Sequence, residues 1–198
     1  SVFYHGKNIF TDSIPYGGTH VTADIARGLN TSIACAERIK TLYGSAIPSS
    51  SDDETLIEIA QMNEDTAEYT DEIAIPKARL VQIIMPRMEE IFEMVRDKLN
   101  KNQILQIASQ QIVLSGGASQ LIGVRELAMR KFGKIVRIGR PEQIEGMADS
   151  TSSSAFSASV GLINYISMNY HIYDKVEPAA NRFIQQRSMD RGNGLVAN

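Results

Sequence analysis

The spacing of apolar residues changes abruptly at a pair of glycines just past the middle of the chain. Residues 112–114 form an apolar run of the kind that a buried parallel strand requires, and Gly116 and Gly117 end it. Apolar residues then recur at three-to-four spacing from Leu121 to Phe132, with charged residues between them. The pattern predicts a strand, a Gly-Gly turn and a helix that begins directly after the turn.

The Gly-Gly turn has two interpretations. Glycines carry no Cβ, so a flat ligand can lie against their backbone, and the free N–H groups of a following helix favour a nearby anion. This geometry suits a nucleotide. The alternative is that Gly116 and Gly117 only make a tight connection between a strand and a helix, and an isolated pair of glycines does not decide between the two.

A second passage of the same kind stands at the start of the chain. Residues 1–16 have the pattern of a β-hairpin, and Gly17 and Gly18 follow it. Residues 19–29 then carry an apolar stripe at helical spacing. The chain therefore repeats the order strand, Gly-Gly turn, helix.

The next predicted helix is capped by Thr31 or Ser32 and stops at Gly44. Glu37 and Lys40 stand three residues apart on it, so their side chains are neighbours. Taken alone, the two residues form an ordinary surface ion pair that contributes roughly 0.2–0.5 kcal/mol.

The middle of the chain is predicted to form a separate lobe. A Pro- and Ser-rich stretch at 47–51 marks its boundary, and short strands are expected at 55–61 and 73–75. The clearest helix of the sequence follows, from Pro76 to Leu99. The expected buried stripe of this helix is Leu80, Ile84, Met88 and Ile91.

The last third of the chain is predicted to hold one more strand and one more helix. Residues 134–138 form the strand, and residues 155–168 the helix, with an unusually polar Ser/Thr run at 150–154 before it. Beyond Pro178 the composition is rich in Asn, Gln, Arg and Gly, and we expect the chain to fray there.

Composition excludes several classes of function. With 198 residues, a net charge of −3 and a pI near 5.7, the chain lacks the basic character of nucleic-acid-binding domains, so we predict no DNA or RNA partner. The single Cys35 cannot form an intrachain disulfide, and no signal peptide or membrane span is evident, so the chain reads as cytoplasmic. No metal site is predicted, because the three histidines lack ligand spacing. They are His5, His20 and His171.

Five segments in order resemble one known family. Residues 14–29 are similar to the segment after the second phosphate loop of the bacterial cell-division protein FtsA family, and Ala-Glu-Arg-Ile-Lys at 36–40 follows at the family's distance. Residues 83–93 resemble its long helix and residues 113–121 its adenosine motif. Residues 156–165 are similar to its late helix. The resemblance covers the chain from its start to about residue 170.

The resemblance implies an α/β fold, namely half of an actin-like (ribonuclease-H-like) ATPase domain with an inserted smaller α+β lobe. Residues 1–46 and 106–170 would form subdomain 2A on the adenosine side of the cleft, residues 47–105 the inserted subdomain 2B, and residues 171–198 a partly disordered tail. The family's phosphate loops would precede Ser1, so we expect a fragment. A C-terminal membrane helix is not evident.

The resemblance also implies a ligand, ATP with magnesium, most of whose phosphate and metal contacts are expected outside this chain. Adenosine would lie between the Gly-Gly turn and the helix that carries Glu37 and Lys40. Glu37 would accept from ribose hydroxyls, and Lys40 would line the purine pocket as a donor. The candidate nucleotide-binding residues are Gly17, Gly18, Glu37, Lys40, Ser115, Gly116, Gly117, Ala118 and Gln120.

The implied partners are other copies in an actin-like filament, other division proteins, and the C-terminal tail of the tubulin-like ring protein FtsZ. Lys77, Arg79 and Arg87 on the long helix are candidates to bind carboxylates of that tail. The alternative is that they are solvated charges beside a core helix. The implied location is the inner face of the cytoplasmic membrane at the division site.

Three rival functions stay open on the sequence alone. One is an MreB-like cytoskeletal protein, another a phosphotransferase or Hsp70-type ATPase of the same superfold, and the third a binding module without a nucleotide. An enzyme needs an acid–base group in the cleft, whereas Asp24 and Asp149 have ordinary roles at a helix start and in a loop. We expect weak ATP hydrolysis at most in a full-length protein and none in this chain alone.

Overall fold

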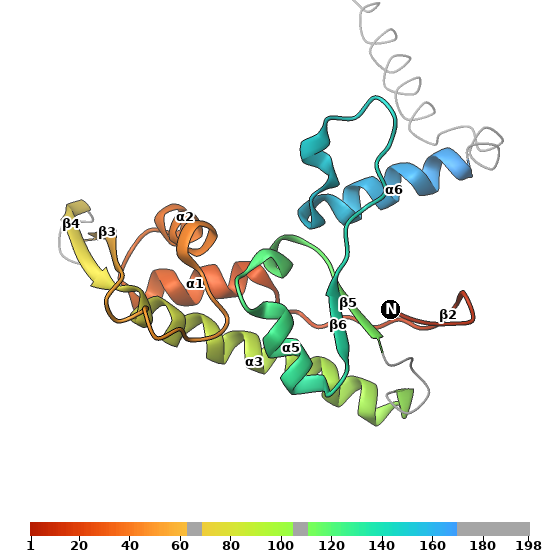
Figure 1. Ribbon diagram of the computed structural model, residues 1–198, viewed down its shortest axis with the longest axis horizontal. Helices are drawn as coiled ribbons and strands as arrows, with labels where there is room; N and C mark the ends of the chain where they lie inside the picture. The colour runs from red at the N-terminus through yellow and green to blue at the C-terminus, as the bar shows by residue number, and fades with distance from the viewer. Residues whose placement is uncertain (63–68, 105–110, 170–198) are drawn as a thin grey trace, which may run out of the picture. The chain divides into compact units, whose positions relative to one another are not determined.

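The structure is a computed structural model that describes residues 1–62, 69–104 and 111–169. The chain falls into two compact units, Ser1–Ser157 and Ala158–Asn198. Element labels follow Figure 1. The helices and strands are β1 (Val2–Tyr4), β2 (Lys7–Phe10), α1 (Gly18–Gly28), α2 (Ile33–Tyr43), β3 (Leu56–Met62), β4 (Tyr69–Pro76), α3 (Lys77–Lys101), β5 (Gln111–Leu114), the 3-10 turn η1 (Gly117–Gln120), α5 (Val124–Phe132), β6 (Ile135–Ile138), the 3-10 turns η2 (Asp149–Ser152) and η3 (Ser154–Phe156), and α6 (Ser157–Met168).

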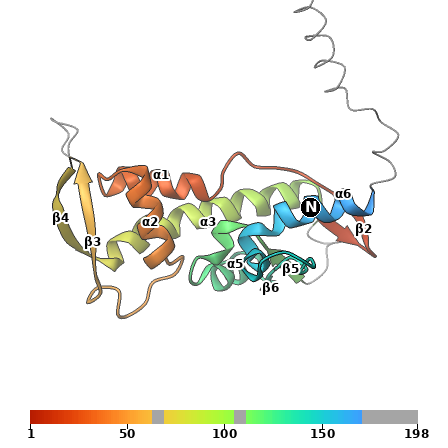
Figure 2. The same ribbon diagram turned by 90° about the horizontal axis from the view of Figure 1, so that it is seen from above.

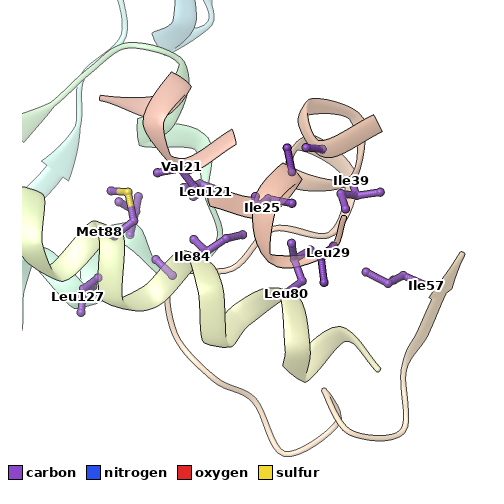
Figure 3. Packing of buried hydrophobic residues seen from close by; sticks show 14 of the residues in the cluster. Val21, Ile25, Leu29, Ile39, Ile57, Leu80, Ile84, Met88, Leu121 and Leu127 are labelled. Atoms are coloured by element: carbon purple, nitrogen blue, oxygen red, sulfur yellow. The ribbon is translucent and has the colours of Figure 1, made fainter. Parts of the chain in front are cut away.

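The long helix α3 organises the first unit. Helices α1 and α5 pack along it, and the β3–β4 pair stands at the end where α3 begins (Figures 1 and 2). Figure 3 shows Ile25 of α1 turned toward Ile84 of α3. Burying one such aliphatic side chain stabilises the fold by about 1.5–3 kcal/mol. The predicted stripe is confirmed: Leu80, Ile84 and Met88 are buried and Ile91 is half-buried.

The described strands pair in three two-stranded sheets. β1 pairs with β2 and β3 with β4, both antiparallel, as hairpins require. β5 and β6 are parallel, with Ile112 opposite Val136, and α5 connects them. The strands predicted at 112–114 and 134–138 are therefore confirmed as one parallel pair that adjoins the Gly-Gly turn.

Helix α2 has the predicted boundaries. The Ser32 hydroxyl accepts a hydrogen bond from the Cys35 amide at 3.1 Å, which caps the first turn. At the other end the Gly44 amide donates to the Lys40 carbonyl at 2.9 Å. The next residues tie α2 to the segment after η1, because the Ala46 amide donates to the Ile122 carbonyl at 2.8 Å.

The helix after the Gly-Gly turn begins later than the sequence predicts. Residues 117–120 form a 3-10 turn, and α5 starts only at Val124. Gly123 separates them with a φ of +72°, a left-handed conformation that favours glycine. A Cβ at this position would also meet Ile47 Cγ1 at 2.2 Å. Leu121 fits the helical spacing and is buried, but it lies in the connection, so periodicity alone extended the helix too far.

Helix α6 begins at Ser157, two residues after the start predicted for it, because a 3-10 turn occupies Ser154–Phe156. The tail at 171–198, which was predicted to be partly disordered, and the first residues of the 106–170 segment lie outside the residues that the structure describes. The division into 2A and 2B subdomains stays a prediction. Among the described residues no helix is long and apolar enough to cross a membrane.

Candidate functional site

A cavity of about 440 Å³ opens between the paired helices α1 and α2 on one side and the η1 turn on the other. The start of α1, the exposed side of α2 and the residues after the Gly-Gly turn supply its walls. Six of the nine predicted nucleotide-binding residues line it, namely Gly18, Glu37, Lys40, Gly117, Ala118 and Gln120. The remaining lining residues are Thr19, Thr41, Gly44, Leu121 and Ile122.

The other three predicted residues lie near this cavity but do not line it. Gly17 precedes α1 and adjoins the lining residue Gly18. Gly116 adopts a φ of +91°, and its amide donates to the Ser154 carbonyl at 2.8 Å. Ser115 at the end of β5 lines a different cavity, of about 780 Å³, between the β1–β2 hairpin, α3 and β5.

Lys40 is the buried cation of the cavity wall, with only 9% of the residue exposed. Its ammonium donates to Glu37 Oε2 at 2.7 Å, to Thr22 Oγ1 at 2.7 Å and to the Gly18 carbonyl at 3.2 Å. The Glu37 side chain, in contrast, is 53% exposed. The pair expected from the sequence is therefore present, but its cation is buried and links α2 to the start of α1.

Glu37 carries the negative charge of the site. Partial burial works to raise the pKa of Glu37, but the hydrogen bonds from Lys40 and Thr22 outweigh it and hold the pKa below its usual value. The carboxylate is therefore ionised at neutral pH. Both of these bonds go to Oε2, and the described residues offer Oε1 no hydrogen-bond partner.

Thr22 is a member of the site that the sequence analysis missed. It lies on α1 and is only 2% exposed, and its hydroxyl contacts Glu37 Oε2, Lys40 Nζ and, at 3.0 Å, the Gly18 carbonyl. The available signal was a hydroxyl next to the apolar stripe of the predicted helix. Such a residue is equally typical of a helix that bonds its own preceding turn, so the pattern did not point to α2.

The Ser/Thr run at 150–154 forms hydrogen bonds with the Gly-Gly turn and the residues directly after it. The Ser119 hydroxyl donates to the Gly116 carbonyl at 2.7 Å and to the Ser154 hydroxyl at 3.1 Å. The side-chain amide of Gln120 also donates, through Nε2, to the Ser153 hydroxyl. These bonds fix the turn that forms one cavity wall, which gives the polar run a physical role that spacing along the chain did not reveal.

The three residues predicted to bind a partner differ in their surroundings. Lys77 lies 2.9 Å from Asp52, which is buried, and Arg87 forms ion pairs with Asp24 and Glu90. The hydrogen bond from Arg87 to Asp24 raises the pKa of the guanidinium. Two of the three cations are thus already paired within the chain.

Arg79 alone of these three has an exposed side chain, and the described part of the chain offers it no ion pair.

The histidine at the start of α1 has a local role: His20 Nδ1 accepts from the Gly17 amide at 3.2 Å. Within residues 1–62, 69–104 and 111–169, no three His, Cys, Asp or Glu side chains gather where they could hold a metal ion.

Comparison with known proteins assigns the chain to a family. A family model described as "Cell division protein FtsA" matches residues 1–161. The chain belongs to the FtsA family. It is 41% identical over 165 residues to FtsA of Rhizobium meliloti, with 83% of this chain and 37% of that protein covered. It is 30% identical over 202 residues to FtsA of Neisseria meningitidis, with 100% of this chain and 45% of that protein covered.

Solved structures show the fold of this FtsA-family chain. MreB5 of Spiroplasma citri bound to ADP superimposes with a TM-score of 0.61 at 15% identity, over 85% of this chain and 50% of that one. The AMPPNP-bound form of the same protein gives a TM-score of 0.60. The fold is therefore actin-like, as predicted, and the higher identities favour FtsA over an MreB-like protein. The chain spans less than half the length of the curated relatives it matches.

Proposed function

We propose that this chain supplies the adenosine side of an ATP-binding cleft in a cell-division protein. The observation that carries the proposal is the cavity itself, because residues far apart in the sequence and predicted to bind adenosine line one hollow. One protein of similar fold, MreB5 of Spiroplasma citri, holds ADP in one structure and AMPPNP in another. The proposal extends this property of the neighbours to the present chain.

The cavity has a suitable size and chemistry for adenosine. Its volume of about 440 Å³ falls within the range of small-molecule pockets, roughly 300–1,000 Å³. Leu121 and Ala118 give it apolar surface for a purine ring, and Glu37 Oε1 gives it an acceptor. A Cβ added to Gly117 would meet no atom within 4 Å, so ligand atoms can lie against this backbone.

The phosphate and magnesium ends of the ligand are not assigned to residues of this chain. The described residues contain no grouping that could hold a metal ion, and the carboxylate of Glu37 repels a phosphate. We therefore assign adenosine recognition alone to the cavity, and no hydrolytic residue.

A valine at position 117 tests the proposal. Gly117→Val projects a branched side chain into open space, so it should fill the cavity without disturbing the fold. In an amide NMR titration of the purified chain with adenosine, we expect saturable shifts at Gly18, Thr41 and Ala118. The variant should weaken binding at least about tenfold, or 1.4 kcal/mol.

The matched control is Gly161→Val in α6, where a Cβ also meets no atom within 4 Å and which is not one of the residues that line the cavity. This control should leave the affinity for adenosine and the shifted amides unchanged. If adenosine caused no saturable shifts in the parent chain, or bound equally well to Gly117→Val, the cavity would not be an adenosine site.

We also propose that the protein assembles into actin-like filaments at the inner face of the membrane and binds the acidic FtsZ tail. The family and the fold support an assembly role. For the tail, Arg79 is the strongest of the three predicted cations, because Lys77 and Arg87 already pair with acids of this chain. An exposed guanidinium can form a bidentate pair with a carboxylate.

A tail-peptide titration separates these residues. Arg79→Glu should weaken binding of an acidic FtsZ-tail peptide severalfold, and the effect should shrink at high salt because exposed charges are screened over about 8–10 Å. Lys101→Glu, at the opposite end of α3, is the control for a change of the same charge. Equal affinity of Arg79→Glu and the parent would remove Arg79 from the partner site.

Filament assembly is tested by sedimentation with ATP. A result that shows only monomer over a wide concentration range would contradict assembly.

A further inference from the structure

We propose that a second cavity beside the η1 turn binds the phosphate group of a small phosphomonoester. This cavity has a volume of about 650 Å³, and η1, the start of α5, the end of β6 and the η2 and η3 turns supply its walls. The inference does not depend on the adenosine site. It gives a ligand to the polar Ser/Thr run at 150–154, which the proposed function leaves without one.

Serines make up five of the fourteen residues that line the cavity, and three of their hydroxyls are occupied within the protein. The buried hydroxyls of Ser119 and Ser154 bond to each other at 3.1 Å, and Ser119 also bonds to the Gly116 carbonyl at 2.7 Å. The Ser152 hydroxyl donates to the Asp149 carbonyl at 2.7 Å. These three serines therefore shape the cavity and do not bind its ligand.

The other two serines have unused donors. The Ser153 hydroxyl oxygen accepts from the side-chain amide of Gln120 and, at 3.4 Å, from the backbone amide of Ala155. A hydroxyl has two acceptor lone pairs and one proton, so the oxygen is occupied and the proton is left over. The Ser150 hydroxyl, on an exposed residue of η2, has no hydrogen-bond partner among the described residues. Both protons can go to a ligand that accepts hydrogen bonds.

Arg140 adds an unpaired cation to the same cavity. It follows β6, its side chain is exposed, and the described part of the chain gives it no ion pair. The other guanidinium of the lining, that of Arg125, bonds to Glu126 at 3.1 Å. The remaining acid, Asp149, accepts from the side chain of Gln143 at 2.8 Å. Both acids thus have donors from this chain, whereas the N–H groups of Arg140 have no acceptor.

The unused donors favour a phosphate group. Arg140, Ser150 and Ser153 belong to three different segments that line one cavity. A phosphomonoester has three acceptor oxygens that point in different directions, so it can accept from a guanidinium and from two hydroxyls together. A carboxylate has only two oxygens in one plane and would leave one of these donors unused.

The size of the cavity indicates a body attached to the phosphate. A volume of about 650 Å³ falls within the range of small-molecule pockets, roughly 300–1,000 Å³. Leu121, Val124 and Ile138 give it apolar surface, and the Glu126 carboxylate can accept from a hydroxyl of the ligand. The expected ligand class is therefore a short phosphomonoester that also carries hydroxyl groups.

The experiment is an amide NMR titration of the full chain with glycerol 3-phosphate at constant ionic strength. We expect saturable shifts at Arg140, Ser150 and Ser153, no saturable shifts with glycerol, and weaker binding of inorganic phosphate at the same amides. Arg140→Gln should weaken binding of glycerol 3-phosphate about tenfold, because it removes a charge-assisted hydrogen bond.

Matched variants separate binding from stability. Arg130→Gln makes the same change of charge in the last turn of α5, at an exposed residue outside the lining, and should leave the affinity unchanged. Ser150→Ala removes an unused donor and should weaken binding about threefold, with no change in the melting temperature. Ser153→Ala also removes the acceptor of Gln120, so Ser150→Ala remains the test of the hydroxyls if Ser153→Ala does not fold.

Three results would overturn the inference. One is equal affinity of Arg140→Gln and Arg130→Gln for glycerol 3-phosphate, which would show that the phosphate does not lie at Arg140. Another is saturable shifts at Gly18 and Thr41 instead, which would place the phosphate in the cavity between α1, α2 and η1. The third is a lack of saturable shifts with glycerol 3-phosphate. Inorganic phosphate that bound as tightly as glycerol 3-phosphate would contradict the assigned ligand class, since the body of the ligand would then contribute nothing.

Discussion

Two lysine–carboxylate pairs in this chain differ in which partner is buried, the lysine or the acid. In the cavity wall the cation is buried, since the side chain of Lys40 is 10% exposed and that of Glu37 is 53% exposed. In the loop before β3 the acid is buried, since Asp52 is 3% exposed and Lys77 is 18% exposed. Asp52 also accepts from the Ser49 amide at 2.7 Å, so its oxygens serve the loop.

The difference distinguishes a pair whose acid is enclosed by the protein from a pair whose acid faces a cavity. At the loop, Asp52 Oδ2 accepts from the Ser49 amide and the buried Oδ1 lies 2.9 Å from Lys77 Nζ, so the ion pair joins the loop to the first turn of α3. At the cavity, the protein holds one oxygen of the carboxylate and leaves the other without a partner among the described residues. The spacing of lysine and acid along the sequence does not predict which partner is buried, because the exposure of each side chain depends on the fold.

The largest expected effect is on the loop pair. Asp52→Ala leaves Lys77 without its partner and the Ser49 amide without an acceptor, so it should lower the free energy of unfolding by about 2–4 kcal/mol. Chemical denaturation measures this. Asp53→Ala, at the exposed neighbouring position, is the control and should change stability by less than about 0.5 kcal/mol. Equal effects of the two substitutions would show that the pair is not structural.

Replacing each lysine in turn by methionine tests directly whether the two pairs have different roles. Lys40→Met should weaken adenosine binding about tenfold, because Glu37 loses its fixed position. Lys77→Met should lower stability without changing adenosine affinity at temperatures where the protein is folded. Nucleoside titrations beside melting curves check both results, and a similar loss of affinity in the two variants would erase the distinction.

Acid should weaken the loop pair. Burial works to raise the pKa of Asp52, but the hydrogen bonds from Lys77 and Ser49 outweigh it, so its pKa lies below the unfolded value of 3.8. A depressed pKa in the folded state gives stability that is present above pH 3.8 and lost as the pH falls through the folded value. The stability difference between the parent and Asp52→Asn should therefore be constant from pH 7 to about 5 and narrow below pH 3.8. A difference that does not narrow would contradict the assignment.

The smallest effects are expected on the exposed side of α3. Arg79→Glu should change the free energy of unfolding by less than about 0.5 kcal/mol, since its side chain has no ion pair with a described residue. Arg87→Glu should cost about 1–2 kcal/mol, because it places an anion beside Asp24 and Glu90. Thermal unfolding of both variants tests this order, and a costlier Arg79→Glu would reverse it.

The sequence predicted the elements that depend on local patterns. The cap of α2 at Ser32, its end at Gly44 and the parallel strands around the Gly-Gly turn follow from residue type and spacing within a few positions. The start of α5 did not, because the left-handed Gly123 and its contact with Ile47 depend on tertiary packing.

Some residues of the candidate site were likewise predicted from the sequence, and others were found only in the fold. The resemblance supplied six residues of the cavity lining, but Thr22 lies 15 residues from Glu37 and Ser154 lies 35 residues from Ser119. Arg87 likewise lies 63 residues from Asp24. Hydrogen bonds between such distant residues leave no periodic signal, so neither the contacts of these hydroxyls nor the pairing of Arg87 could be predicted from the sequence.

The most direct test of the proposed adenosine site is a set of intermolecular nuclear Overhauser effects between bound adenosine and methyl groups of this chain. We expect contacts from the purine and ribose protons to the methyl groups of Ala118, Leu121 and Thr41, which line the cavity of about 440 Å³. Saturable binding with contacts instead to Val113 and Ile14, in the separate apolar cavity beside β5, would contradict it.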